Sequence, residues 1–318
     1  MNLFLKIVLI ILAVIVVLVA ILNFAKPWLI FKMMFTRPKR STKVPSFYKD
    51  SPHYKVSRAG LKVLNTYEVE DKYITSRDGL KLHAYMYPAS NPSKKFFIGI
   101  HGYRSYARPE YAPYAEFYHS EGFNILLPDD RAHAPSEGEY IGFGVLDRLD
   151  CVDWAKYVVE TYGKDVEILI QGVSMGGATV LAASGEADLP SQVKGIISDC
   201  GFSSAQDILD FQLKNMARVP SAGKALPKLE KICEKKSGFN FHDYSAKKQV
   251  KKATVPILFV QGGQDKMVPS HMAEDLYKIC PTKKKLLMVP EAGHAESIAF
   301  APDEYYKDIK EMFSEMFL

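Results

Sequence analysis

The sequence is poor in cysteine and contains no Cys-x-x-Cys pair. Four cysteines scattered over 318 residues exclude a disulfide scaffold and argue against a cysteine-based zinc site. Most of the chain also lacks an excess of charge of one sign. The formal net charge is +5, but residues 1–43 carry seven basic residues and no acidic one, which leaves −2 for the rest. We therefore predict no nucleic-acid partner.

A long apolar run stands at the start of the chain. Leu3–Ala25 is apolar except for Lys6 and Asn23, and as a helix it would be about 34 Å long, enough to cross a hydrocarbon core of about 30 Å. A cleaved signal peptide is the alternative, but its apolar region is usually only about 7–15 residues long. The sequence therefore predicts a transmembrane anchor over residues 1–25 in a single-pass protein of the cell membrane, in contact with membrane lipid.

Basic residues follow the apolar run. Six lie within residues 26–43, and the positive-inside rule places such a flank in the cytoplasm. The sequence thus favours a cytoplasmic globular part, although large domains behind single N-terminal anchors are often exported. Residues 26–60 are predicted to form a basic linker, which is either solvated or lies along anionic lipid headgroups.

Residues 61–318 alternate between short apolar strands and helices, which predicts one α/β domain. Two strands at its start form an expected antiparallel hairpin, and the later strands are separated by helices. Such a pattern is typical of a mostly parallel sheet with helices on both faces. The predicted strands are Tyr67–Thr75, Leu80–Pro88, Phe96–Ile100, Phe123–Leu127, Glu167–Gln171, Val193–Ser198, Pro256–Val260 and Lys285–Val289.

One connection is much longer than a single helix requires. More than 50 residues, basic in balance, separate Asp199 from the strand that starts at Pro256. We predict a helical cap insertion at about residues 202–252. A long crossover with no functional role is the alternative.

The strongest motif is Gly172-Val173-Ser174-Met175-Gly176, at the junction of a predicted strand and a predicted helix. A G-x-S-x-G sequence in this context indicates a nucleophile elbow, in which a tight turn projects a serine hydroxyl from the carboxyl edge of the sheet. The alternative is a glycine-rich turn that merely opens a helix.

A nucleophilic serine needs a base, and the base needs an acid that orients it. His294 follows the last predicted strand, and Asp265 follows the strand before it. The chain order Ser174, Asp265, His294 is the one expected for this kind of sheet. Asp199 also ends a strand and is the rival for the acid. Otherwise we interpret it as ordering a neighbouring loop.

Acyl transfer also requires donors for the developing oxyanion. The backbone N–H groups of Met175 and Tyr103 are the expected donors, because Met175 opens a helix and Tyr103 follows His101-Gly102 at the end of a strand. His101 is interpreted as a structural loop residue. Tyrosines 103, 106, 111 and 114 either line an apolar pocket with the cap or serve in helix packing.

On these residues, the sequence resembles the α/β-hydrolase superfamily. Within it, the chain is similar to membrane-anchored bacterial hydrolases related to Bem46-like and serine aminopeptidase-like proteins. The resemblance extends from about Lys62 to the end and includes the segment Asp130–Gly138, where the family has Gly in place of Ala132 and Ala134. It implies the α/β-hydrolase fold and loop-ordering roles for a set of polar residues, which are Asp130, Arg131, His133, Asp147, Arg148 and Asp150.

Together these observations predict a serine hydrolase that cleaves a small-molecule carboxylic ester through an acyl-serine intermediate. Ser174, His294 and Asp265 are its expected triad, with the N–H groups of Tyr103 and Met175 as the oxyanion hole. No metal and no organic cofactor are expected. An acyl-peptidase or a thioesterase on the same triad is the alternative. A membrane-tethered binding module on an inactive scaffold is the non-enzyme alternative.

Overall fold

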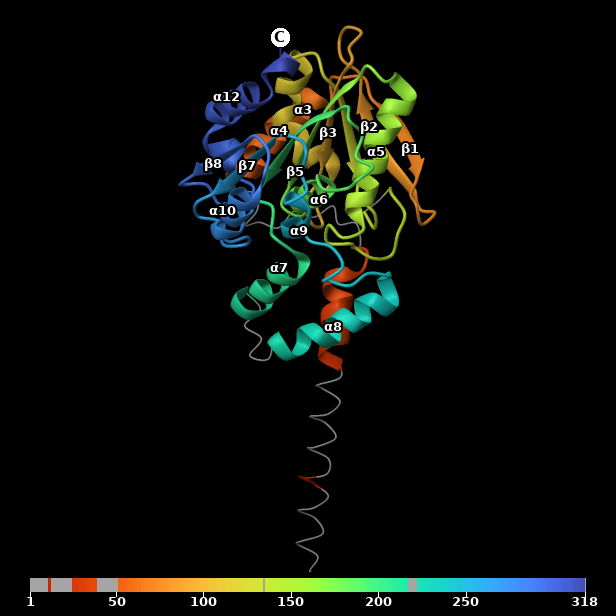
Figure 1. Cartoon of the computed structure of the whole chain (residues 1–318), viewed down its shortest axis with the longest axis vertical. Helices are drawn as coiled ribbons and strands as arrows, with labels where there is room; N and C mark the ends of the chain where they lie inside the picture. The colour runs from red at the N-terminus through yellow and green to blue at the C-terminus, as the bar shows by residue number, and fades with distance from the viewer. Residues whose placement is uncertain (1–10, 13–24, 39–50, 134, 217–221, 318) are drawn as a thin grey trace, which may run out of the picture.

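The computed structural model describes residues 11–12, 25–38, 51–133, 135–216 and 222–317 (Figure 1). Its centre is an eight-stranded sheet in the order β1-β2-β4-β3-β5-β6-β7-β8, in which β2 runs opposite to the other strands. The strands are β1 (Glu70–Thr75), β2 (Lys81–Tyr87), β3 (Lys95–Ile100), β4 (Asn124–Asp129), β5 (Glu167–Val173), β6 (Val193–Asp199), β7 (Ile257–Gly262) and β8 (Lys284–Val289). The predicted hairpin and the mostly parallel sheet are confirmed.

Helices cover both faces of the sheet, as the alternating pattern predicts. Successive side chains of a strand point to opposite faces, so Phe97 of β3 packs into one apolar layer while Phe96 and Ile98 pack into the other. The first layer includes residues of α3 (Pro52–Leu64), α4 (Ala107–Ser120) and α12 (Pro302–Met312). The second includes residues of α5 (Asp147–Tyr162), α6 (Met175–Ala183) and α10 (Ser270–Ile279).

The long connection between β6 and β7 is helical. It contains α7 (Ala205–Phe211), a π-helical turn (Gln212–Met216), α8 (Ala222–Ser237) and α9 (Ala246–Val250). In Figure 1, α7 and α8 lie below the body of the domain, whereas α9 lies against it. A serine precedes each of the short helices α7 and α9, Ser204 and Ser245, and its hydroxyl accepts a backbone N–H and so caps the helix.

Two folded segments lie within the range expected to be a basic linker. One is the start of α3, and the other is a helix over residues 25–35, hereafter the N-terminal helix, drawn in red beside α8 in Figure 1. Phe31 and Phe35 of the N-terminal helix are 1% and 0% exposed, in a third apolar cluster with residues of α7 and α8. A backbone hydrogen bond of 2.7 Å from Ile141 to Phe35 fixes the end of this helix on the domain.

The segment expected to span the membrane, residues 1–25, lies outside the described residues except for positions 11, 12 and 25. Within the part of the chain that the structure describes, no helix combines the length and the apolar character needed to cross a bilayer.

Candidate active site

Ser174 occupies a sharp turn between β5 and α6. Its backbone dihedrals are φ 56° and ψ −112°, a strained region for a residue other than glycine. A Cβ atom at Gly172 would lie 2.1 Å from the carbonyl oxygen of Gly176, and one at Gly176 would lie 1.9 Å from that of Ile100. Only glycine fits at either position, so the two glycines allow the turn that projects the serine.

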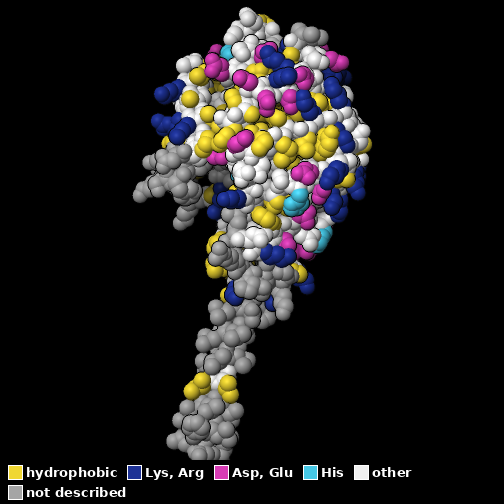
Figure 2. All heavy atoms as spheres, turned by 90° about the vertical axis from the view of Figure 1, so that its left-hand side faces the viewer, with side chains coloured by type: hydrophobic (Ala, Val, Ile, Leu, Met, Phe, Trp, Pro, Cys, Tyr) yellow, Lys and Arg dark blue, Asp and Glu magenta, His cyan; other side chains and the backbone are white. Residues whose placement is uncertain are grey.

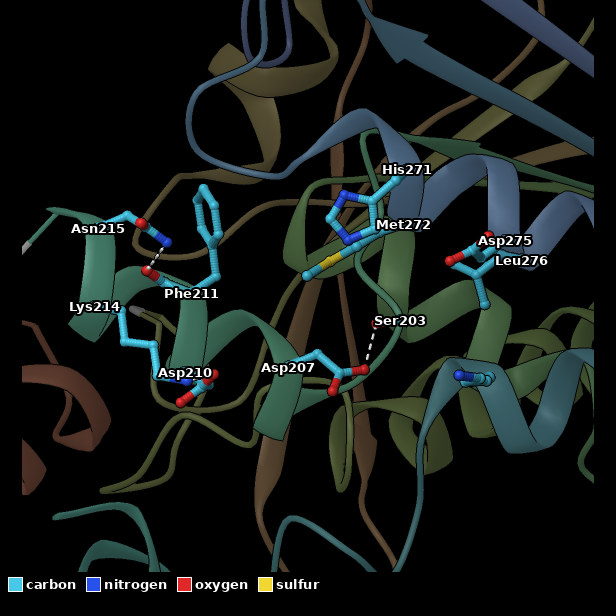
Figure 3. A pocket seen from close by; sticks show the side chains of 11 residues that line it. Ser203, Asp207, Asp210, Phe211, Lys214, Asn215, His271, Met272, Asp275 and Leu276 are labelled. Carbon is cyan, nitrogen blue, oxygen red and sulfur yellow. Dashed lines mark hydrogen bonds and ion pairs between the residues drawn. The ribbon is translucent and has the colours of Figure 1, made fainter. Parts of the chain in front are cut away.

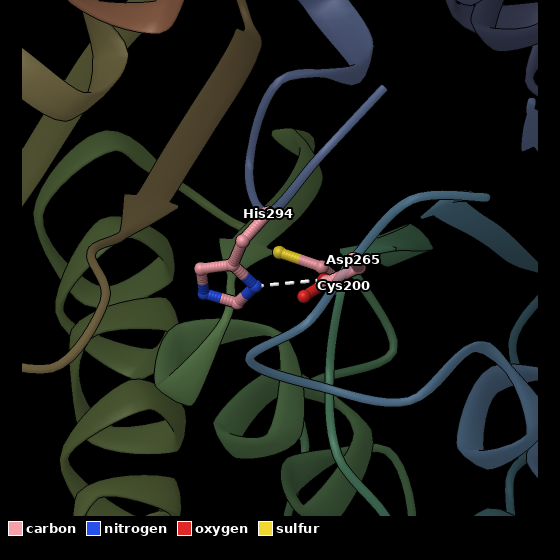
Figure 4. Close-up of side chains that lie close together, drawn as sticks. All are labelled: Cys200, Asp265 and His294. Atoms are coloured by element: carbon pink, nitrogen blue, oxygen red, sulfur yellow. Dashed lines mark hydrogen bonds and ion pairs between the residues drawn. The ribbon is translucent and has the colours of Figure 1, made fainter. Parts of the chain in front are cut away.

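The structure brings together the three residues of the predicted triad. His294 Nε2 lies 2.9 Å from Ser174 Oγ, and His294 Nδ1 lies 2.7 Å from Asp265 Oδ2. Asp265 Oδ1 accepts the backbone N–H groups of Met267 at 2.8 Å and Val268 at 2.9 Å. The carboxylate is thus held on one side by its own loop, and its other oxygen is directed at the imidazole (Figure 4).

The surroundings of His294 favour its protonated form. Burial alone would lower the pKa of the imidazole, but the hydrogen bond and the charge of Asp265 outweigh this effect and raise the pKa above its ordinary value of 6.5. The Asp265 side chain itself is fully buried. A base with a raised pKa is well suited to take a proton from a hydroxyl group.

Asp199, the rival acid, lies behind the elbow and not beside the imidazole nitrogen. Its Oδ2 accepts the hydroxyl groups of Tyr305 at 3.1 Å and Tyr114 at 3.4 Å. Its backbone carbonyl accepts the N–H of Ser174 at 2.8 Å. Burial raises the pKa of Asp199 to about 7, against partial compensation by Tyr305. These contacts make Asp199 a residue that supports the turn of Ser174.

Cys200, which sequence reasoning missed, lies next to the triad. The Cys200 sulfur, a carboxylate oxygen of Asp265 and a ring nitrogen of His294 all lie within 4.8 Å of one another (Figure 4). Burial raises the pKa of the Cys200 thiol, and Asp265 and His294 are already hydrogen-bonded to each other. The thiol is therefore a neutral neighbour of the triad. Its position directly after Asp199 is the signal that could have found it.

The loop after β3 carries the expected oxyanion donor Tyr103. A Cβ at Gly102 would lie 3.4 Å from Cβ of Ser174, which shows how closely this loop approaches the nucleophile. Met175, the other expected donor, is the first residue of α6, where backbone N–H groups have no partner within the helix. The loop that carries one sequence-predicted donor and the helix that begins at the other thus both adjoin Ser174.

This loop (residues 102–105), named the oxyanion loop after its expected donor, is tied to the N-terminal helix. The Tyr103 hydroxyl donates to the carbonyl oxygen of Met34 at 2.9 Å, and the Arg104 guanidinium donates to the carbonyl of Met33. Arg104 has a left-handed backbone, with φ 55°, and its N–H donates to His133 Nε2 at 3.1 Å. The segment that positions the oxyanion loop therefore comes from residues expected to be linker, and sequence reasoning missed it.

The His294 loop has its own support from α3. His53, which is buried, donates from Nδ1 to the carbonyl of Ala295 at 2.9 Å. Ala295, directly after His294, has φ 58°. Ser57, one turn further along α3, donates to the carbonyl of Pro109 at 2.7 Å. A polar helix at the start of the domain thus holds the loop that carries the base.

The polar residues expected to order loops have structural partners. His101 accepts the N–H of Asp130 through Nε2 at 3.1 Å and is fully buried, as expected of a structural histidine. Arg131 bonds Asp150 through two nitrogens, at 2.6 and 2.7 Å. Further contacts join Asp147 to the N–H of Gly144 and Arg148 to Glu186, both at 2.7 Å.

Ala132 stands where the resembling family has glycine, and its backbone is left-handed with φ 61°. The loop keeps the conformation that glycine would adopt more easily, at some cost in strain. The other departure, Ala134, lies outside the described residues.

Two of the tyrosines considered for a substrate pocket are core residues instead. Tyr111 and Tyr114 are each 1% exposed and pack in the apolar layer of α3, α4 and α12. The Tyr111 hydroxyl donates to backbone carbonyls, among them that of Ile100 at 2.7 Å. Tyr103 packs instead against Phe143 beside the nucleophile, with ring centroids 5.2 Å apart. Helix packing therefore explains positions 111 and 114.

A cavity of about 360 Å³ lies between α7 and α10 (Figure 3). It is lined by apolar side chains such as Phe211 and Met272 together with charged ones such as Asp207 and Lys214. None of the triad residues lines it. The side chains that surround Met175 belong to the apolar cluster of the cap and the N-terminal helix.

Two family models match parts of the chain. The first, described as alpha/beta hydrolase fold, matches residues 100–226, and the second, described as serine hydrolase (FSH1), matches residues 170–295. Together these ranges contain Ser174, Asp265 and His294.

Similar proteins occur in bacteria and yeast. YqkD of Bacillus subtilis is 26% identical over 61% of this chain, and the match spans 63% of YqkD, less than two thirds of its length. YfhR of Escherichia coli K12 is 23% identical over 76% of this chain and 79% of its own length. Protein bem46 of Schizosaccharomyces pombe is 23% identical over 78% of this chain and 77% of its own length.

Among solved structures, the esterase Pf2001 of Pyrococcus furiosus superposes with a TM-score of 0.65 at 22% identity, over 89% of this chain and all of the esterase. A puromycin-hydrolyzing peptidase of Mycobacterium tuberculosis superposes with a TM-score of 0.59 at 18% identity, over 78% of this chain and 39% of the peptidase. At these identities the likeness concerns the fold.

Proposed function

Because the chain is an α/β-hydrolase similar to Bem46-like proteins, we propose that it is a serine hydrolase that cleaves carboxylic esters. The observation that carries the proposal is the continuous hydrogen-bonded path from Ser174 Oγ through both nitrogens of His294 to Asp265, at 2.9 and 2.7 Å. That arrangement meets the geometric requirement for an activated serine nucleophile.

The proposed reaction begins when Ser174 Oγ attacks the ester carbonyl and His294 Nε2 takes the hydroxyl proton. Asp265 holds the other nitrogen in the correct tautomer and stabilises the imidazolium. The oxyanion accepts the N–H groups of Tyr103 and Met175. His294 then protonates the departing alcohol. Water, activated by His294, hydrolyses the acyl-Ser174 intermediate and restores the free serine.

The surroundings of the nucleophile favour an apolar acyl group. Met175 packs in a cluster that also contains Phe35, Phe143, Leu213 and Val268. An apolar wall stabilises a hydrocarbon chain by about 0.8 kcal/mol for each buried CH₂ group. A peptide amine would need acidic partners, and the basic cap offers a poor site for it. Peptidase and thioesterase activities are therefore outcomes of the test below.

We also propose that residues 1–25 anchor the enzyme in the cell membrane as a single span. The support is the length and apolar character of Leu3–Ala25. The excess of basic residues after this run favours a cytoplasmic hydrolase domain.

The proposed activity can be tested by labelling membrane fractions with a fluorophosphonate probe, followed by turnover of p-nitrophenyl esters of increasing chain length. Ser174→Ala should abolish labelling and lower ester turnover by roughly 10⁴-fold or more. Ser203→Ala, in the cap, is a matched control that should label normally. Labelling of Ser174→Ala at the wild-type rate would refute the assignment. Faster turnover of thioesters or of aminoacyl amides would shift the substrate class but keep the nucleophile.

A further inference from the structure

Exposed apolar side chains gather on the N-terminal helix. Trp28, Leu29 and Met33 are 39%, 59% and 61% exposed, while Phe31 and Phe35 on the other side of the same helix are buried. Lys26 and Lys32 are exposed among them. A mixture of tryptophan, aliphatic side chains and lysine on one helix face is typical of the boundary between membrane and water.

Helix α8 crosses the N-terminal helix at this place. Leu229 and Cys233 of α8 are fully buried in one cluster with Phe31 and Phe35. Lys236 Nζ lies 5.8 Å from the centroid of the Trp28 ring, and Lys32 Nζ approaches the same ring to 5.4 Å. The two helices are thus packed together near Trp28. Figure 1 shows the N-terminal helix beside α8.

The outer side of α8 carries a row of lysines. Lys228, Lys231 and Lys235 are exposed, and their spacing of three and four residues places them on one side of the helix, away from Leu229 and Cys233. Over its whole length α8 contains five lysines and two glutamates. Lys and Arg side chains lie among hydrophobic ones at the end of the body from which the N-terminal helix emerges (Figure 2).

The distance between the α8 lysines and the end of the apolar run Leu3–Ala25 suggests what these lysines bind. Trp28 follows the last residue of the run, Ala25, by three residues, a rise of about 5 Å along a helix. Because α8 packs on Trp28, its lysines lie within about one helix diameter, ~10 Å, of the level at which the run ends. Exposed lysines are ordinarily solvated, but this row lies at the level of the expected lipid headgroups.

We propose that the lysine row of α8, together with Trp28, Leu29 and Met33, docks on an anionic phospholipid surface. Negative headgroups match the lysines, and the three apolar side chains enter the boundary between headgroups and acyl chains. The proposal goes beyond the anchor, because it assigns a lipid contact to the cap. It also stands independently of the ester chemistry of Ser174.

The test uses the full chain in bilayer discs of phosphatidylcholine alone or mixed with phosphatidylglycerol. Hydrogen–deuterium exchange along α8 should slow by about fivefold or more in the anionic discs, the effect expected of one lysine near such a surface. The triple variant K228Q/K231Q/K235Q should lose this slowing. A second triple variant, K164Q/K194Q/K307Q, removes the same charge from other exposed sites and should keep it.

Trp28 supplies a second measurement. The chain has two tryptophans, and Trp154 is 1% exposed in the core, so W154F leaves Trp28 as the fluorescent reporter. Brominated phospholipids should quench its emission by about twofold or more, as expected of a ring in the boundary layer. If W154F does not fold, exchange at α8 in the wild-type chain still decides the question.

Each outcome bears on the proposal. Equal exchange along α8 in both kinds of disc would overturn it, whether or not the chain hydrolyses esters. A chain recovered only in anionic discs, in a manner that depends on the α8 lysines, would support the docking face and refute the anchor. Protection of α8 by soluble polyglutamate but not by anionic lipid would indicate an acidic protein partner and would also overturn the proposal.

Discussion

The triad loops and the oxyanion loop lie on two sides of the same serine but are held by different parts of the chain. Ser174 directly follows β5, and Asp265 and His294 lie in the short loops after β7 and β8, so the sheet sets their positions. The oxyanion loop also follows a strand, but its side chains are tied to the N-terminal helix, almost 70 residues earlier in the sequence.

This difference separates the chemistry of the site from its support. The sheet positions the side chains of the triad, whereas the N-terminal helix holds only the loop of Tyr103, one of the two expected oxyanion donors. Changes to the triad should therefore alter the chemical step, and changes at the helix contact should alter stability and positioning. Substitutions on each side separate the two roles, and those in the triad should have the largest effect.

Replacement of Asp265 by Asn should lower kcat by up to about 10⁴-fold without unfolding the protein, because an amide favours the wrong tautomer of His294. The matched variant is Asp199→Asn, which alters an acid that contacts tyrosines and not the imidazole nitrogen. It should stay within about tenfold of the wild-type rate, since positions away from reacting atoms act through stability. The measurement is kcat and Tm for both variants. If Asp199→Asn were inactive and Asp265→Asn active, Asp199 would be the acid that orients His294 and Asp265 the supporting residue.

Phe35→Ala should destabilise the domain by about 3–5 kcal/mol, the usual cost of deleting a buried phenylalanine side chain. Phe35 is 0% exposed between the cap and the body, although the sequence places it in a linker. Met33→Ala, two residues earlier and 61% exposed, should change stability by no more than about 0.5 kcal/mol. Urea unfolding of both variants measures the difference. Equal stabilities would mean that the N-terminal helix is not part of the folded unit.

Arg104→Gln should lower kcat by roughly 10–100-fold with a smaller change in KM, because loss of one oxyanion donor costs about 10²–10³-fold and a loosened donor costs less. Arg104 holds the loop against the carbonyl of Met33. Arg77→Gln removes an arginine that bonds Asp153 and Asp188 away from the site, and its rate should match the wild type. A fall in Tm with unchanged kcat per folded molecule would restrict Arg104 to a structural role.

Stability should depend on pH through Asp199. Its pKa in the folded protein is about 7, against an ordinary value of 3.8, so the folded state holds this proton more tightly. The corresponding stabilisation is complete below pH 3.8 and is lost as the pH rises through about 7. The Tm difference between Asp199→Asn and the wild type should therefore change in favour of the variant over that interval. A difference that is constant with pH would contradict the raised pKa.

The smallest effect concerns the acid limb of the rate profile. His294 must be neutral to act as a base, and its pKa is raised above 6.5, so kcat/KM should already fall as the pH drops toward that value. The negative charge of Asp199 contributes to this raised pKa. Asp199→Asn should therefore move the acid limb to lower pH by less than about one unit. A shift to higher pH would show that Asp199 does not interact with His294 as a charge.

The fold and the triad could be predicted because both depend on short-range patterns. Apolar strands between helices predict the sheet, and the elbow, Asp265 and His294 each follow such a strand. Glycines 172 and 176 signal the turn even before the carbonyl contacts that require them are seen.

The support of the site could not be predicted in the same way. The contacts of Tyr103 and Arg104 with Met34 and Met33 involve backbone carbonyls, which any residue type provides. His53 bonds a backbone carbonyl as well, and nothing in its neighbourhood in the sequence marks it. Phe31 and Phe35 lie among basic residues, so composition indicated a basic linker, either solvated or along lipid headgroups, and gave no sign of a buried helix.

The hydrogen bond between Tyr103 and Met34 also limits how far the oxyanion loop can lie from a membrane that holds the apolar run. Met34 follows Ala25 by nine residues, which is about 14 Å of helix. With the apolar run embedded, the oxyanion loop cannot rise further than roughly this distance above the bilayer surface, however the domain tilts. The enzyme would then search a thin layer next to the lipid in two dimensions and would meet esters concentrated there far more often than esters dispersed in bulk water.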